Sequence, residues 1–153
     1  MLRRREQPDP STLQVEKVLL ASEGRDYSHE TLDFAAQFGA PVYVFSIARV
    51  WGTGLGLPMP GLLPSKGEWD EQRENVERAV RRLKARGVRA AGAVVGTRRG
   101  AKRIVREAQR LECDVIVMGG DRELPYLLAD FMWSQEPYRV RRRAKIPVYV
   151  VVE

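Results

Sequence analysis

The residues best suited to chemistry gather around a glycine pair, Gly119 and Gly120, that follows a short apolar run starting at Val115. Val and Ile dominate this run, which is typical of a strand buried on both faces of a sheet. Glycines at the end of such a strand let backbone N–H groups approach an anion, because no Cβ intervenes. Arg122 follows, and a planar guanidinium suits phosphate. The stretch predicts a phosphate site or, without a ligand, a plain strand-to-loop turn.

Other catalytic chemistry is sparse in the sequence. There is no readable Ser/His/Asp spacing, no carboxylate pair and no cluster of metal ligands, so we expect no catalytic residues and no metal. His29 is the single histidine, and we interpret it as a surface residue in the first turn of a helix. The lone Cys113 excludes an internal disulfide, and we expect a buried, unreactive thiol. The sequence favours a protein without enzymatic activity.

Alternating apolar patterns predict the elements that would position these residues. Short apolar runs indicate five strands, and periodic amphipathic stretches between them indicate four helices. Such alternation is typical of a single-domain α/β fold, a doubly wound parallel sheet with helices on both faces. The predicted strands are 17–22, 41–47, 89–95, 115–119 and 147–152, and the predicted helices are 28–38, 68–86, 100–111 and 134–143.

The domain organisation follows from length and composition. A chain of 153 residues suits one domain, which we place at residues 15–153. Residues 1–14 are polar and include Arg3–Arg5, so we expect a disordered or loosely attached tail. Residues 49–67 are rich in Gly, Pro and Leu and predict an inserted loop. This loop either covers an apolar surface or partner subunit, or lies on its own domain.

Charge permits an anionic partner without requiring one. The formal net charge is +6 and the pI is about 9.8. The basic run from Arg139 to Lys145 falls at the end of a predicted helix, where positive charge complements the helix dipole. We therefore do not expect a nucleic acid partner. No apolar run reaches the roughly 18 residues of a membrane helix, and no signal peptide is recognisable, so we expect a soluble cytoplasmic protein.

Four stretches together resemble the universal stress protein family. They are Val18–Gly24, Val94–Gly96 with the helix that follows, Asp114–Gly119 and Ile146–Val151, and the similarity extends from Glu16 to Val152 in order and spacing. The resemblance implies a five-stranded parallel sheet of the adenine nucleotide alpha hydrolase-like type. It also implies a small cytoplasmic protein that is usually dimeric. One branch of the family binds ATP in the crevice between the first and fourth strands.

The ATP-binding branch carries a G-x2-G-x9-G-[ST] motif after the fourth strand. Counted from Gly120, the second glycine falls on Glu123, the third on Trp133 and the hydroxyl residue on Ser134. Two of the three glycines are therefore replaced, which makes the motif degenerate. The resemblance places Glu23 at the acidic position near the ribose or adenine, and Ile47 or Ala48 beside the adenine. The candidate nucleotide-binding residues are Glu23, Ile47, Gly119, Gly120, Arg122 and Ser134.

Three functional hypotheses follow. The first is a non-enzymatic stress-response protein with a degenerate or lost ATP site. It would act as a homodimer through the apolar terminal strand Val148 to Val152, because an uncovered edge of this kind invites pairing. The second is a protein that binds ATP or AMP through an altered phosphate loop, with slow hydrolysis. The third is a polyanion-binding module that uses Arg3–Arg5 and the run from Arg139 to Lys145.

Overall fold

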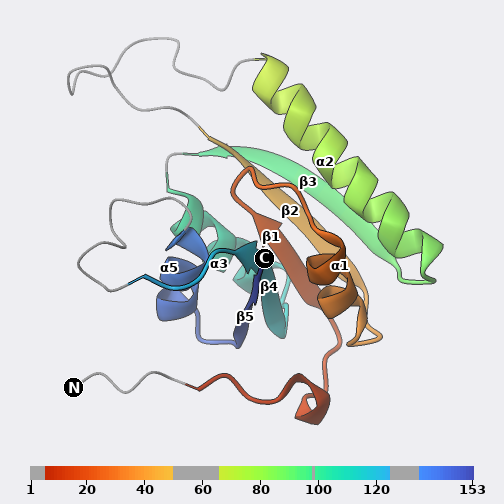
Figure 1. The fold of residues 1–153 in the computed structure, drawn as a ribbon, viewed down its shortest axis with the longest axis vertical. Coiled ribbons are helices and arrows are strands. Elements are labelled where there is room, and N and C mark those ends of the chain that lie inside the picture. Colours follow the sequence, from red (N-terminus) through yellow and green to blue (C-terminus); the bar gives the residue numbers. More distant parts are fainter. Residues whose placement is uncertain (1–5, 50–65, 98, 125–134) are drawn as a thin grey trace.

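A five-stranded parallel sheet forms the centre of the protein, with strand order β3-β2-β1-β4-β5 (Figure 1). The computed structural model describes residues 6–49, 66–97, 99–124 and 135–153. The predicted doubly wound α/β fold is confirmed. The strands are β1 (Val18–Ser22), β2 (Val42–Arg49), β3 (Ala90–Thr97), β4 (Val115–Gly120) and β5 (Val148–Val152).

Helices cover both faces of the sheet and create two separate cores. Strand side chains alternate between the faces, so Leu20 of β1 packs with one pair of helices and Leu19 with the other. One core lies under α1 (His29–Ala36) and α2 (Lys66–Ala85). The other lies under α3 (Gly100–Arg110) and α5 (Glu136–Arg143). None of the helices in the described ranges is long and apolar enough to cross a membrane.

The ends of the predicted inserted loop differ from the sequence expectation of residues 49–67. Strand β2 continues to Arg49, because it pairs with β3 as far as Arg49 and Thr97. Helix α2 already begins at Lys66, so its first residues precede the predicted start at Glu68. The rest of that loop lies outside the described residues. The ends of α1 and α2 agree more closely with the sequence. Gly39 and Gly87 follow these helices with positive φ angles of 63° and 78°, a conformation that glycine adopts readily at helix ends.

The segment before β1 is attached to the sheet over residues 6–14, in contrast to the expected loose tail. The Gln7 side-chain oxygen accepts a hydrogen bond of 2.8 Å from the Val148 N–H at the start of β5. The Tyr149 hydroxyl donates to the Pro8 carbonyl at 2.6 Å, and Leu13 packs against the core. Composition alone did not indicate this attachment, because its partners lie at the opposite end of the chain. Residues 1–5 lie outside the described residues.

Candidate functional site

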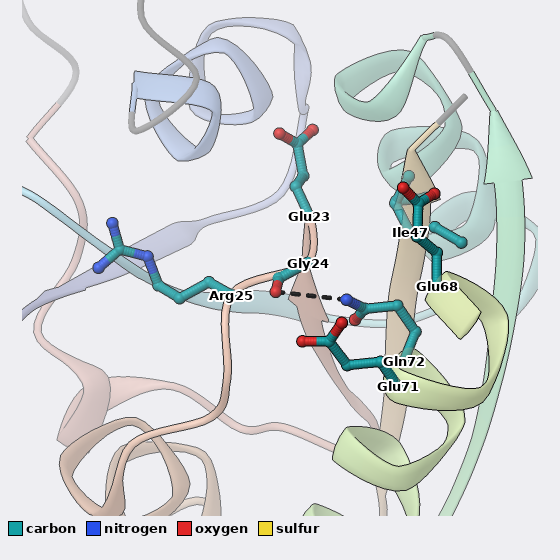
Figure 2. Close-up of a pocket in the computed structure, with 8 residues that line it drawn as sticks. Glu23, Gly24, Arg25, Ile47, Glu68, Glu71 and Gln72 are labelled. Carbon is teal, nitrogen blue, oxygen red and sulfur yellow. Dashed lines mark hydrogen bonds between the residues drawn. The ribbon is translucent and has the colours of Figure 1, made fainter. Parts of the chain in front are cut away.

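A cavity of about 380 Å³ opens at the carboxyl ends of β1 and β2, bordered by the first turns of α2 (Figure 2). Ligands of open α/β sheets bind at this edge, where the strand order reverses. The order β3-β2-β1-β4-β5 places that reversal between β1 and β4, so the cavity lies at the neighbouring strand pair, β1 and β2. The cavity is lined by Glu23, Gly24, Arg25, Ile47, Ala48, Glu68, Glu71 and Gln72.

The turn after β1 brings the backbone to the cavity mouth. Gly24 has a φ of 102°, which glycine adopts without the strain that a side chain would add. The Ser22 hydroxyl, at the end of β1, donates to the Arg25 carbonyl and closes the turn. Ser28 then begins α1, where its hydroxyl accepts a hydrogen bond from the Thr31 N–H at 3.1 Å. The turn and the Ser28 cap together lead the chain from β1 into α1.

Helix α2 supplies the polar wall of the cavity through Gln72. Its side chain is 7% exposed, accepts a 2.7 Å hydrogen bond from the buried Ser46 hydroxyl and donates to the Gly24 carbonyl at 3.4 Å (Figure 2). Gln72 therefore joins α2 to both β2 and the β1 turn. Beside it, the Tyr27 hydroxyl donates to the Phe45 carbonyl at 3.2 Å, and burial raises the pKa of Tyr27. These uncharged hydrogen bonds fix α2 and the end of β2 next to the cavity.

The electrostatic character of the cavity is acidic. Of the described residues that line it, Glu23, Glu68 and Glu71 are acidic and Arg25 is basic. The Arg25 side chain extends away from α2 (Figure 2), toward Asp121 at 3.1 Å and Glu153 at 3.4 Å. The guanidinium is thus paired elsewhere. The cavity favours a neutral or cationic group and opposes a phosphate.

The glycine pair of β4 lies away from this cavity and packs against the protein itself. A Cβ on Gly120 would lie 3.1 Å from both Pro137 Cγ and Val150 Cγ1. A Cβ on Gly119 would lie 3.0 Å from the Thr31 hydroxyl oxygen and closer still to the Glu153 carboxylate. Internal packing therefore accounts for the lack of a side chain at both positions. Both glycines pair with β5 as the last residues of β4, so they do not form the turn that was the alternative expectation.

The start of α5 is also occupied by groups of the chain. Gln135 is 1% exposed, and its side chain accepts from the Leu124 N–H at 2.7 Å and donates to the Arg122 carbonyl at 3.0 Å. These two bonds tie the segment after β4 to the helix. The Arg122 side chain itself is exposed and does not line the cavity. Ser134, the predicted hydroxyl residue, and Trp133 lie outside the described residues.

Glu136 connects the beginnings of α5 and α3. Its carboxylate accepts a 2.9 Å hydrogen bond from the Ala101 N–H, in the first turn of α3, and a 2.6 Å hydrogen bond from Arg139. The Glu23 carboxylate lies directly against the Cα of Gly100, where a Cβ would overlap it. A helix N-terminus attracts anions, and here two carboxylates of the protein take that position on α3.

The structure thus brings together only part of the predicted set. Glu23 and Ile47 share one cavity, whereas Gly119, Gly120 and Arg122 lie outside its lining. Sequence reasoning missed Gln72, Gln135 and Glu136. A signal for Gln72 existed, because Gln72 and Asn75 continue the buried stripe of Val76, Ala79 and Leu83 at helical spacing. No comparable pattern marks Gln135 and Glu136, whose partners are distant in the sequence.

Metal and thiol chemistry find no support at this site. Within the described ranges, no group of three or more His, Cys, Asp or Glu side chains is arranged to hold a metal ion. Cys113 is 6% exposed, and burial raises the pKa of its thiol to about 11. A thiol with so high a pKa is a poor nucleophile near neutral pH. The expected burial of Cys113 is confirmed.

Comparison with known families decides the classification. The model of the universal stress protein family matches residues 14–152. The chain belongs to this family. No curated protein matches the chain in sequence. This result agrees with the family resemblance of the sequence. The matched residues include the lining of the cavity, the glycine pair of β4 and the starts of α3 and α5.

Solved universal stress proteins share the fold at low sequence identity. One from Burkholderia pseudomallei is 24% identical with a TM-score of 0.63, over 90% of this chain and 96% of that chain. One from Archaeoglobus fulgidus in complex with dAMP is 19% identical with a TM-score of 0.63, over 91% and 99%. A universal stress protein in complex with cAMP is 19% identical with a TM-score of 0.65, over 91% and 98%.

Proposed function

We propose that this universal stress protein is a non-enzymatic, cytoplasmic stress-response protein whose crevice no longer binds ATP in the family manner. The observation that carries the proposal is the Glu136 carboxylate, bonded to the Ala101 N–H at the start of α3. A phosphate at this helix end would have to displace it. Gln135 adds to the barrier, because its two hydrogen bonds hold the segment after β4 in place.

Charge repulsion supports the same conclusion. Two like unit charges about 4 Å apart repel by about 4 kcal/mol at an effective dielectric constant near 20. A triphosphate in the crevice would approach the Glu71 carboxylate at the cavity. Arg25, the basic residue among the described lining residues, is already engaged by Asp121 and Glu153. The charge of Glu71 therefore opposes a highly charged anion.

Isothermal titration calorimetry with ATP tests this proposal. We expect no saturable heat for the wild-type protein at ATP concentrations up to about 1 mM, which corresponds to a binding free energy weaker than about −4 kcal/mol. Glu136→Gln keeps an oxygen that can accept from the Ala101 N–H but removes the charge, so ATP binding should become stronger. Glu77→Gln, on exposed α2, is the matched control with the same charge change. A micromolar dissociation constant for the wild type would contradict the proposal.

The proposal includes a homodimer formed through β5. Pro147 and Glu153, which flank β5, form backbone hydrogen bonds to β4. Backbone groups alternate in direction along a strand, so those of Val148, Val150 and Val152 point to the open edge of the sheet. Those of Val148 are already used by Gln7 and Arg141. Val150 and Val152 remain for pairing with a second copy, and Val152 is 55% exposed.

Light scattering after size exclusion measures this part separately from nucleotide binding. We expect a dimer for the wild-type chain at micromolar concentration, and a monomer for Val150→Pro, which removes the central edge-facing N–H. Val151→Thr, whose backbone faces β4, serves as the control for the strand itself. A monomeric wild type that is fully folded would contradict the dimer but leave the ATP result unaffected.

Binding of a smaller adenine nucleotide such as AMP is the second candidate. The observation in its favour is the cavity that joins Glu23 with Ile47, the two residues that the family resemblance assigns to the ribose and adenine. Two of the similar universal stress proteins are in complex with dAMP and with cAMP. This candidate predicts a rise in melting temperature with AMP that Glu23→Ala diminishes. No shift at millimolar AMP would exclude it.

A further inference from the structure

The positive charge of the protein is concentrated on one face of the sheet. Together α3 and α5 carry seven arginines and one lysine against two glutamates, Glu107 and Glu136. This excess of six positive charges equals the formal net charge of the whole chain. The opposite face, formed by α1 and α2, carries six basic and seven acidic residues. The two faces therefore differ strongly in electrostatic potential, although their helices belong to the same compact sheet.

The two glutamates on the basic face are turned inward. Glu107 is 2% exposed and forms ion pairs with Arg103 and Arg110, and Glu136 is 9% exposed and pairs with Arg139. These buried carboxylates fix the arginine side chains around them and contribute little negative charge to the surface. The helices α3 and α5 pack against each other over one core (Figure 1). Their exposed basic residues therefore lie on the same face of the sheet.

Several cations on this surface are available to a ligand. Lys102, Arg106 and Arg143 are exposed, and none of them forms an ion pair with another residue in the described ranges. Three arginines on and beside α2 are different: Arg73 pairs with Asp70, Arg78 with Asp26 and Arg86 with Asp33. The dipole of α5 explains positive charge at the end of that helix. It does not explain Lys102, which lies in the first turn of α3, where positive charge opposes the helix dipole.

We propose that the face formed by α3 and α5 binds the phosphate backbone of duplex nucleic acid without reading its sequence. The exposed Arg106 and Arg143 favour phosphate oxygens, because a planar guanidinium can donate two parallel hydrogen bonds. Among the described residues, the exposed large apolar side chain is Val152 of β5, so the described part of α3 and α5 offers no apolar side chain for insertion into a membrane. The described residues of this face also offer no exposed ring on which unpaired bases would stack.

Fluorescence anisotropy with a labelled DNA duplex of arbitrary sequence tests the proposal. We expect binding at low salt that weakens linearly with the logarithm of salt concentration, with equal affinity for a second duplex of unrelated sequence. The triple variant Lys102→Gln/Arg106→Gln/Arg143→Gln should bind about tenfold more weakly or worse. The salt slope should fall by about 1 for each phosphate contact removed.

The triple variant Arg81→Gln/Arg82→Gln/Lys84→Gln on α2 is the matched control. It removes the same number of arginines and lysines from the opposite face, so it changes net charge equally. We expect its affinity to stay within about twofold of the wild type. Equal losses in both variants would overturn the proposal, because net charge alone would then explain binding. Absence of binding at low salt, or stronger binding to vesicles with anionic lipids or to polyglutamate than to the duplex, would also overturn it.

Discussion

The two halves of the crevice differ in how the sheet edge is covered. At β1 and β2 the strands end in a cavity of about 380 Å³, framed by Gly24, Ile47 and Gln72. At β4 the described residues instead make contacts within the chain: Pro137 packs on Gly120, and Gln135 and Glu136 bond backbone groups after β4 and at the start of α3. The two halves therefore present different surroundings to a ligand within one fold.

The largest expected effect is a difference in unfolding free energy between alanine variants of two buried glutamines, Gln135 and Gln72, one from each half of the crevice. Gln135→Ala removes two hydrogen bonds from a side chain that is 1% exposed, and leaves the Leu124 N–H and the Arg122 carbonyl without their partner. We expect a loss of about 2–3 kcal/mol in the free energy of unfolding. Gln72→Ala, beside the open cavity, should cost about 1–2 kcal/mol, because its bond to Gly24 is long at 3.4 Å.

Urea denaturation of both variants measures this difference. The dependence of the unfolding free energy on urea should have the same slope as in the wild type, which would show that the unfolded state is unchanged. A larger loss for Gln72→Ala than for Gln135→Ala would mean that the half at β1 and β2, rather than the half at β4, carries more of the stability.

A smaller difference in stability is expected between alanine variants of the two glycines of β4. Gly120→Ala places a methyl group 3.1 Å from both Pro137 and Val150, which lie in α5 and β5 and can yield little. We expect a loss of about 1–2 kcal/mol. Gly119→Ala meets the Glu153 carboxylate and, at 3.0 Å, the Thr31 hydroxyl oxygen; both are ends of side chains that can rotate away, and the variant should cost less than about 1 kcal/mol. Equal melting temperatures for the two variants would argue against tight packing at Gly120.

The smallest effect is a change in stability with pH that arises near the C-terminal end of α3. The start of this helix is the one bonded to Glu136. Hydrogen bonding from Arg110, opposed in part by burial, lowers the pKa of Glu107. A carboxyl group whose folded pKa lies below its unfolded value of about 4.3 stabilises the protein above that pH. This contribution is lost as the pH falls through the folded pKa. Glu107→Gln should therefore cost about 1 kcal/mol at pH 7 and progressively less below about pH 4.

Thermal unfolding of Glu107→Gln and the wild type between pH 3 and pH 7 follows this change. The surface variant Glu112→Gln, at an exposed position just after α3, provides the control for general acid effects. A constant difference between Glu107→Gln and the wild type across this range would show that the charge of Glu107 does not stabilise α3.

The sequence predicted the fold well because each strand and helix carries a local signal. Short apolar runs rich in Val and Ile, such as Val115–Met118, favour buried strands, and Gly39 and Gly87 mark helix ends because glycine readily adopts positive φ angles. The candidate site was predicted in part, since Glu23 and Ile47 directly follow or end strands. The contacts at the start of α5 were not predicted. Glu136 reaches Ala101 across 35 positions, and no periodicity in the sequence encodes such a pair.

The attachment of Gln7 to Val148 has a consequence for how β5 can be disturbed. The strand is clamped at its first residue by a side chain 141 positions earlier, and just past its last by the Glu153 N–H bonded to the Gly120 carbonyl. Proteolytic trimming or a bulky tag on either side would therefore fray the same strand. Labels for solution experiments are better placed at an exposed helix position such as Glu77.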